Sequence, residues 1–219
     1  MKDLLKQIAS FAWDIPIERT TSEHNPYLEV VWSNGKKMLN TKDANFSFGN
    51  GYLVFEKAFD LIKDFVPTSK KSLILGFGCG SILHLLEKKY NYQGEIVGVE
   101  YDQVILDLFQ KHFAHEYTKE PKLITGDAQK FVHQNDELYD LIFVDLFTEL
   151  DNVEFIFNKD FIYRLRSICD QGGVIVFNTI KRNPKDQQKL SGLIMDLSKH
   201  FKDVSSTSFQ DLNQIIIAK

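Results

Sequence analysis

The sequence predicts an α/β fold. We expect a seven-stranded sheet of five parallel strands and a closing antiparallel hairpin, preceded by a small N-terminal β-hairpin region. Short apolar runs alternate with segments of helical periodicity from residue 71 onward, as in parallel sheets whose strands are joined by helices. A glycine-rich turn follows the first of these apolar runs. Nearer the N-terminus, Asn34-Gly35 joins two strand-like runs, which is a strong hairpin signal.

Length and composition bound the class of protein. The 219 residues suit one domain with a small appendage, and we expect a helix and β-hairpin region over 1–51 before an α/β domain over 52–219. A net charge of −4 gives no general attraction to nucleic acid or anionic membranes. No run nears the roughly 18 apolar residues of a membrane span. Two cysteines and the lack of a signal-peptide pattern predict a cytoplasmic protein with reduced thiols.

The spacing of apolar residues predicts each element before residue 71. Pro16 and a polar run to Asn25 interrupt regular structure after the first helix. The expected elements are a helix over 2–11, hairpin strands over 27–33 and 36–41, a short strand at Phe46 and Phe48, and a helix over 52–65 that Pro67 ends.

The α/β body repeats strand and helix. Asp102 and Asn183 are expected to cap helices, and Gly172-Gly173 to end one. The link between the last two strands is too short for a crossover helix, so this pair should be antiparallel. The expected strands are 73–75, 94–100, 121–125, 139–145, 174–178, 201–208 and 212–218.

A pocket is expected beyond the carboxyl ends of the parallel strands, where open α/β sheets bind ligands. Gly76, Gly78 and Gly80 allow the backbone to approach a ligand closely. Glu100 ends the second strand about twenty residues later, a spacing at which an acid can bind ribose hydroxyls. Asp127 and Asp145 also follow strands, although each could instead only cap the segment after it.

The run from Leu73 to Asn178 resembles the spermidine synthase-like branch of class I S-adenosylmethionine-dependent methyltransferase-fold proteins. The matching pieces are LILGFGCGS, IVGVEYD, ITGDAQKF, YDLIFVDLF and GGVIVFN, and the hairpin at Asn34-Gly35 resembles the small β domain of that family. The resemblance implies a Rossmann-like methyltransferase sheet and a transferase activity, and together with the β appendage it favours a homodimer. It also implies S-adenosylmethionine, or its decarboxylated form, as the ligand.

The resemblance also implies roles for single residues. The three glycines would line the amino-acid end of the ligand, and Glu100 would hold its ribose. Asp127 would accept from the adenine amino group, Ala128 would donate a backbone N–H to the ring, and Asp145 would lie beside the sulfonium. Residues counted with the cofactor site are Gly76, Phe77, Gly78, Gly80, Glu100, Tyr101, Asp127, Ala128 and Asp145.

Two departures bear on the reaction. Spermidine synthases have an aspartate where this chain has Cys79, and a second one where it has Thr148; these acids bind the amines of donor and acceptor. Glu149 stands next to Thr148 and could substitute. We therefore expect methyl or aminopropyl transfer, with Asp145 catalytic and Phe147, Thr148 and Glu149 facing a small amine. The alternatives are a spermidine synthase proper and a non-catalytic member of the fold.

Three other groups of residues allow more than one interpretation. The loop over 146–157 combines acids with phenylalanines, which suits a cationic acceptor or, equally, a solvated loop packed on the sheet. Cys79 follows the turn without a motif that supplies a base, which favours a packing role. His112 and His115 share a helix face but lack a zinc motif, so no metal is expected.

Overall fold

A computed structural model describes the whole chain except residues 1, 43–44, 48–49, 149–150 and 211. Its central layer is a seven-stranded sheet in the order β12-β13-β11-β8-β5-β6-β7. All neighbours from β11 to β7 pair in parallel, and β13 is antiparallel to both β11 and β12. This confirms the five parallel strands and the closing hairpin. The strands are β5 (Lys71–Leu75), β6 (Glu95–Glu100), β7 (Lys122–Thr125), β8 (Tyr139–Val144), β11 (Cys169–Ile180), β12 (Val204–Phe209) and β13 (Asn213–Ala218).

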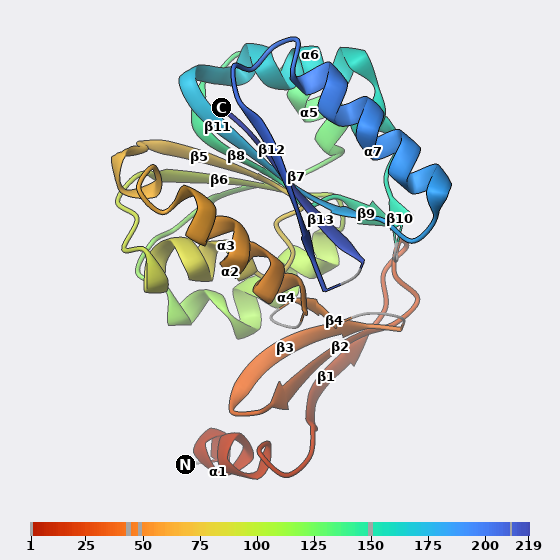
Figure 1. Cartoon of the computed structure of the whole chain (residues 1–219). Coiled ribbons are helices and arrows are strands. Elements are labelled where there is room, and N and C mark those ends of the chain that lie inside the picture. The colour runs from red at the N-terminus through yellow and green to blue at the C-terminus, as the bar shows by residue number, and fades with distance from the viewer. Residues whose placement is uncertain (1, 43–44, 48–49, 149–150, 211) are drawn as a thin grey trace.

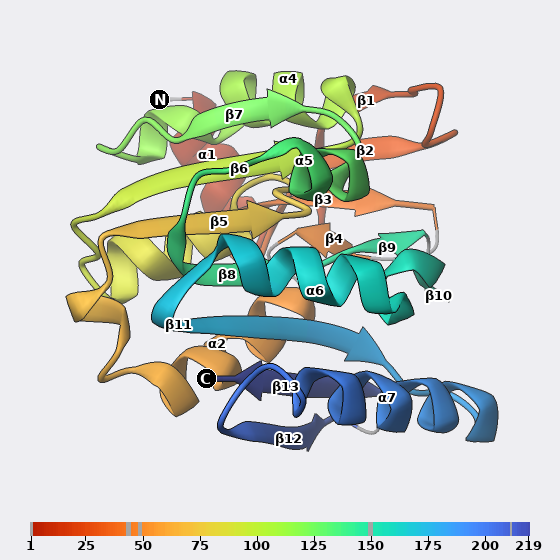
Figure 2. The ribbon, with the colours of Figure 1, turned by 90° about the horizontal axis from the view of Figure 1, so that it is seen from above.

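Helices cover both faces of this sheet (Figures 1 and 2). Alternate residues of each strand enter one of two hydrophobic clusters, which explains the near-continuous apolar runs of the parallel strands. One face carries α2 (Asn50–Ile62), α3 (Ser81–His84, continued by π-type turns to Lys89) and α4 (Gln103–His112). The other carries α5 (Ala128–Gln134), α6 (Lys159–Ile168) and α7 (Pro184–Leu197).

A four-stranded antiparallel sheet precedes this body, in the order β1-β2-β3-β4. It follows α1 (Lys2–Ala9). Asn34 and Gly35 have φ of 49° and 75°, as a two-residue turn with two left-handed positions requires, so the predicted hairpin is confirmed. Buried residues of this sheet join the cluster on the α2–α3–α4 face. The strands are β1 (Ile15–Thr20), β2 (Leu28–Ser33), β3 (Lys36–Thr41) and β4 (Asn45–Ser47).

Two sequence expectations need correction. Strand β1 was not expected, because Pro16 and polar neighbours obscure its pattern; as the edge strand of its sheet, with an irregular register at Pro16, it tolerates a proline. Gly172-Gly173 does not end a helix. Helix α6 ends at Ile168, and the glycines lie inside β11, where the register with β8 shifts between Cys169 and Val174. Phe48 lies outside the described residues, although β4 forms beside it.

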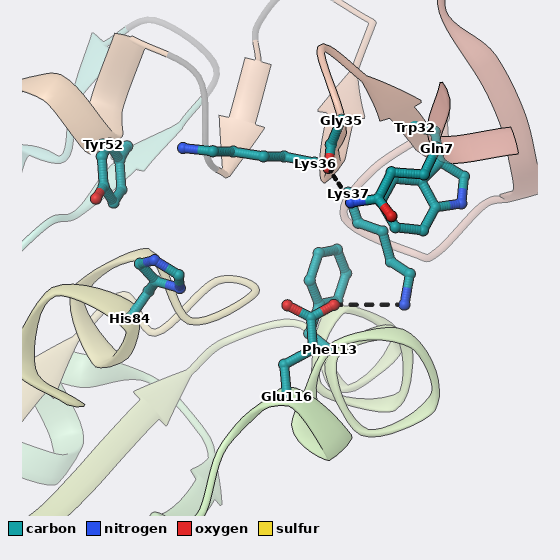
Figure 3. A pocket seen from close by; sticks show the side chains of 9 residues that line it. All are labelled: Gln7, Trp32, Gly35, Lys36, Lys37, Tyr52, His84, Phe113 and Glu116. Atoms are coloured by element: carbon teal, nitrogen blue, oxygen red, sulfur yellow. Dashed lines mark hydrogen bonds and ion pairs between the residues drawn. The ribbon is translucent and has the colours of Figure 1, made fainter. Parts of the chain in front are cut away.

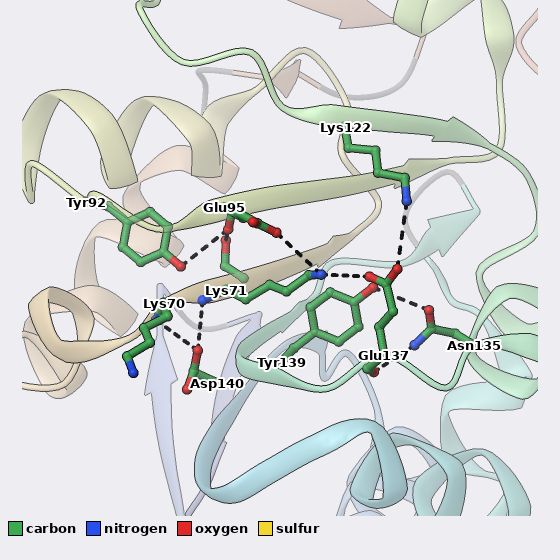
Figure 4. Close-up of polar contacts among 10 residues, drawn as sticks. Lys70, Lys71, Tyr92, Glu95, Lys122, Asn135, Glu137, Tyr139 and Asp140 are labelled. Atoms are coloured by element: carbon green, nitrogen blue, oxygen red, sulfur yellow. Dashed lines mark hydrogen bonds and ion pairs between the residues drawn. The ribbon is translucent and has the colours of Figure 1, made fainter.

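Charged groups join the amino ends of the parallel strands (Figure 4). Lys71 lies 2.7 Å from Glu137 and 3.4 Å from Glu95, and these contacts raise its pKa, mostly through the hydrogen bond to Glu137. The Asp140 carboxylate accepts 2.8 Å hydrogen bonds from the backbone N–H groups of Lys70 and Lys71. This network fixes the sheet at the edge opposite the strand-end acids, so it serves the fold.

Candidate functional site

The glycine turn after β5 has the backbone form that a close-approaching ligand requires. Gly76, Gly78 and Gly80 have φ of 85°, 57° and 87°, a region that residues with a side chain rarely adopt. A Cβ on Gly76 would lie 2.0 Å from the carbonyl oxygen of Asp145. The turn therefore holds two strand ends together with no room for a side chain at Gly76.

Glu100 ends β6 beside this turn, and its carboxylate is buried. It accepts hydrogen bonds from the backbone N–H groups of Gly78 (2.9 Å), Tyr101 (2.9 Å) and Asp102 (3.2 Å). Burial raises its pKa, while these three N–H groups oppose the rise. Because an ionised carboxylate offers about four acceptor positions, Glu100 keeps capacity for a hydroxyl donor.

Asp145 follows β8 and is held by a chain of two amides. The Asn178 side chain donates to Asp145 Oδ1 at 3.0 Å, and Asn213 donates to Asn178 Oδ1 at 2.9 Å. These amides come from β11 and β13, neighbouring strands of the sheet. Burial raises the pKa of Asp145 to about 7; the Asn178 hydrogen bond opposes this rise and the charge of Glu100 adds to it. Such a group can accept a proton near neutral pH.

Asp127 caps helix α5 at the same edge of the sheet. Its Oδ1 accepts from the backbone N–H groups of Gln129 (2.7 Å) and Lys130 (3.1 Å). Ala128 begins the helix and is buried. Gly126 N donates to the Glu100 carbonyl at 2.8 Å, which joins this turn to the end of β6. Asp127 therefore does cap the helix. The predicted contact with the adenine amino group would be a second role of the same carboxylate, and it stays a prediction.

Two residues of the glycine turn lie in the core. The Phe77 ring meets Phe109 edge-on at 4.9 Å, and a Cβ on Gly98 would approach it to 2.4 Å. Its backbone N–H and carbonyl also have partners, so the predicted cofactor contact of Phe77 finds no support in its surroundings. Cys79 is fully buried, and burial raises its thiol pKa well above the usual range. A thiol held neutral in this way is a packing residue.

A loop of the N-terminal sheet reaches this site, which sequence patterns did not reveal. Ser22 Oγ and Asn25 Nδ2 both donate to Asp102 Oδ2, the latter at 2.7 Å. The other oxygen of Asp102 caps helix α4 through Val104 N. The rings of His24 and Tyr101 lie 4.4 Å apart, and Tyr101 is otherwise exposed. The β1–β2 loop thereby borders the turn that follows Glu100; its only signal was the Ser-x-x-Asn pattern of a polar turn.

The acidic loop after β8 is tied to its own chain. Its short strands β9 (Phe147–Thr148) and β10 (Asp151–Asn152) pair with each other, and Thr148 is exposed. Asp151 forms an ion pair with Arg182, and Glu154 forms one with Lys189. Asn152 exchanges two hydrogen bonds with the backbone of Ile180, at 2.7 and 2.8 Å.

These contacts favour the packed-loop interpretation over a row of free acids. Phe155 meets Phe161 of α6 at 5.0 Å, and Phe157 lies under the Lys189 ammonium at 5.5 Å. Glu149, the expected substitute for the missing acid, lies outside the described residues. The acceptor roles of Phe147, Thr148 and Glu149 stay predictions.

The paired histidines also serve other contacts. His112 Nε2 lies 2.5 Å from Glu18 Oε2, and His115 Nε2 lies 3.3 Å from Lys37 Nζ. In the part of the chain that the structure describes, no cluster of three or more His, Cys, Asp or Glu side chains could hold a metal ion. Over the same residues, no helix has the length and apolar character needed to cross a membrane.

Comparison with known proteins identifies the chain. The glycine turn, the strand-end acids and the sheet order define a Rossmann-like α/β protein of the methyltransferase type. Within that class, the model of the spermine/spermidine synthase domain matches residues 53–210, so the chain belongs to this family.

The relatives give the family context. A polyamine aminopropyltransferase of Saccharolobus islandicus is 33% identical over 115 residues, which cover 49% of this chain and 38% of that protein. The chain thus aligns with less than half the length of this curated relative. A probable spermidine synthase of Corynebacterium glutamicum has the same fold, with a TM-score of 0.69 and 15% identity over 94% of this chain and 77% of that one. Human methyltransferase-like protein 13, solved with SAH, gives 0.62 at 17% identity, with 78% and 82% covered.

Proposed function

We propose that the protein is a transferase that takes a nucleoside sulfonium of the S-adenosylmethionine type and moves its aminopropyl or methyl group to a small amine. The observation that carries this proposal is the meeting of Asp145, Glu100 and the glycine turn at one edge of the sheet. The buried carboxylate of Glu100, the half-buried carboxylate of Asp145 and the close-packed glycine turn form a site that suits a cationic ligand with ribose hydroxyls.

In this proposal each strand end has one task. Glu100 binds a ribose hydroxyl with the acceptor position that its three backbone donors leave. Asp127 and Ala128 bind the adenine edge, the glycine turn admits the amino-acid end, and Tyr101 borders the ribose. When bound, the sulfonium supplies an activated carbon next to a good leaving group.

The chemical step needs little from the protein beyond position. The acceptor nitrogen attacks the carbon bound to sulfur, the carbon–sulfur bond breaks, and its electron pair leaves with a neutral thioether. Asp145 takes the proton released from the alkylated nitrogen. A pKa near 7 suits that task, because the group is then ionised in a large share of molecules at neutral pH.

Different observations favour the two transferred groups. The named relatives favour aminopropyl transfer, and spermidine synthesis from putrescine is the nearest version of it. Methyl transfer is favoured by the buried, neutral Cys79, which stands where the family's aspartate would bind the donor amine. The pairing of Asp151 and Glu154 with Arg182 and Lys189 further reduces the acids open to a polyamine.

Thermal unfolding with each donor tests the proposal. At a hundred times its dissociation constant, a ligand adds about 2.7 kcal/mol of stability, which raises Tm by about 5–10 °C in a chain of this size. A rise with the decarboxylated donor alone supports aminopropyl transfer, and a rise with S-adenosylmethionine alone supports methyl transfer. No rise with either would contradict the proposal and favour a non-catalytic member of the fold.

We also propose that the protein acts in the cytoplasm as a homodimer. Five apolar side chains of α1 and the residues after it are 59–69% exposed, and exposed apolar side chains grouped along one segment are typical of an interaction surface. We assign this surface to a second copy of the chain. The residues are Leu4, Leu5, Ile8, Phe11 and Trp13.

A further inference from the structure

A cavity of about 220 Å³ lies between the N-terminal sheet and the helices of the α/β body. Figure 3 shows its walls, which come from α1, the hairpin, α2, α3 and the segment after α4. Helix α4 begins at the turn after Glu100 and runs ten residues, about 15 Å, before it ends near Phe113 of this cavity. The cavity shares no lining residue with the site of the strand-end acids, so it is a separate place for a ligand.

Charges of opposite sign face each other across the cavity. Lys36 extends along one side, with its ammonium 5.6 Å from the centre of the Tyr52 ring. Glu116 rises from the opposite side with its carboxylate toward the cavity (Figure 3). Lys37 holds Glu116 at 3.4 Å and donates to the His112 carbonyl at 2.8 Å, so the carboxylate is fixed yet keeps acceptor positions.

The remaining walls are largely aromatic. Trp32, Tyr52 and Phe113 line the cavity together with His84, whose ring meets Tyr52 at 5.8 Å. Burial and the charge of Lys36 lower the pKa of His84, which favours the neutral imidazole. Lys36 is therefore the cation that faces this side of the cavity, and the space between the two charges is bounded by rings.

We propose that this cavity binds an α-amino acid with an aromatic side chain, as a zwitterion. Lys36 binds the carboxylate, Glu116 binds the ammonium group, and the ligand's ring lies among Trp32, Tyr52 and Phe113. Only a molecule with both charges pairs with Lys36 and Glu116 at the same time, since an amine or an acid alone gains just one of these two contacts. At about 220 Å³ the cavity is small, which favours a small molecule over a larger ligand.

Trp32 supplies the readout for a test. The chain has two tryptophans, and the other, Trp13, is 67% exposed, so a Trp13→Phe background leaves Trp32 as the reporter. L-phenylalanine, phenethylamine and 3-phenylpropionate carry the same ring with both charges, the amine alone and the acid alone. We expect a saturable change in Trp32 fluorescence with phenylalanine, at a dissociation constant at least tenfold below that of either analogue.

Two variants assign the charges. In Glu116→Gln, phenylalanine should bind no better than phenylpropionate, and in Lys36→Gln no better than phenethylamine. Exposed Lys185→Gln and Glu120→Gln are matched controls that should leave binding unchanged. No saturable change, equal affinity for all three ligands, or unaltered binding in both variants would overturn the assignment. The readout is binding in this cavity alone, so its failure leaves the transferase proposal untouched.

Discussion

Gly76 is the position of the turn that leaves least room for change. An added Cβ would overlap the Asp145 carbonyl oxygen at 2.0 Å, and φ is 85°. We predict that Gly76→Ala lowers the free energy of unfolding by at least about 2 kcal/mol, from backbone strain and displacement of β8. It should also abolish the donor-induced rise in Tm. Chemical denaturation and thermal unfolding with each donor measure the two effects.

Gly126→Ala is the matched control for this prediction. Gly126 also follows a strand at the site, but nothing lies within 4 Å of its added Cβ. Its stability should change by less than about 1 kcal/mol. Equal losses in the two variants would contradict the steric account of Gly76.

Asp145 should give the protein an unusual pH dependence. Its pKa rises from 3.8 to about 7 on folding, so the folded state disfavours the charged form. A group of this kind destabilises increasingly as the pH rises from about 4 to 7, and its penalty is constant above that range. We predict that Asp145→Asn is more stable than the parent at pH 8, that the difference vanishes near pH 4, and that transfer is lost.

Denaturation of both proteins in urea at several pH values measures this difference. The amide keeps an oxygen for Asn178, so the shape of the site is retained. An Asp145→Asn variant that is less stable at pH 8 would show that the carboxylate is stabilised by partners, against the effect of burial.

The acidic residues at the ends of the parallel strands were the part of the site that the sequence could predict. Glu100 and Asp145 follow apolar strands, and parallel strands end at one edge, so their meeting follows from pattern alone. The direction of a side chain does not. Phe77 and Cys79 belong to the same turn as the glycines, yet they point into the core, since a buried ring beside Gly98 is a property of packing.

Among the elements, the β1–β2 loop depends on Asp102. This carboxylate caps α4 and also accepts from Ser22 and Asn25. We predict that Asp102→Ala lowers the free energy of unfolding by about 2–4 kcal/mol, through the lost cap and the lost charged hydrogen bonds. Hydrogen exchange should rise in β1 and β2 as the loop separates from the body.

Asn183→Ala separates the two contributions. Asn183 caps α7 through the N–H groups of Lys185 and Asp186 and is remote from the N-terminal sheet. It should cost about 1 kcal/mol, with exchange in β1 and β2 unaltered. Unchanged exchange in Asp102→Ala as well would mean that the loop is held by other contacts.

The loop of β9 and β10 gives a second prediction at this scale. Asp151 and Glu154 form ion pairs with Arg182 and Lys189, so we expect their charges to stabilise the loop and not to bind the acceptor. Asp151→Asn together with Glu154→Gln should change the acceptor KM less than twofold. Steady-state kinetics with the acceptor found for the enzyme measure this. A tenfold rise in KM, with kcat retained, would assign these acids to the acceptor.

Helices and strands that depend on their local sequence were predictable. Those that depend on pairing with a neighbouring strand were not. A two-residue hairpin turn requires two left-handed residues, and Asn34 and Gly35 both adopt this conformation. This hairpin was predictable because it depends on the local sequence alone. Strand β1 exists because β2 offers it an edge, which outweighs Pro16. The glycines at 172 and 173 read as a helix end, yet pairing with β8 placed them inside a strand.

At the scale of the whole molecule, the exposed face of α1 predicts association. Leu5→Glu with Ile8→Glu should convert a dimer to a folded monomer, because charges on both apolar side chains oppose burial between copies. Light scattering coupled to size exclusion measures the mass. Met195→Glu, at an equally exposed apolar position on α7, should stay dimeric. A monomeric parent protein, or a dimeric double variant, would contradict this assignment.

The relative placement of the two sheets lay beyond the sequence. Hydrophobic periodicity indicates that a strand buries one face, but it does not name the partner surface. The cluster shared by Val30 and Leu39 with helices α2, α3 and α4 arises only when the chain folds back, and the cavity lined by Trp32 and Phe113 comes with it.

The ion pairs of the β9–β10 loop have a consequence for the acceptor. Arg182 meets Asp151 at an effective concentration on the order of millimolar, because both belong to one chain, so a free amine at lower concentration does not displace it. The loop is thereby closed to single cations from solution. An acceptor ammonium group must therefore find its negative partner elsewhere, and Asp145 at the end of β8 is the carboxylate that the proposed reaction places next to it.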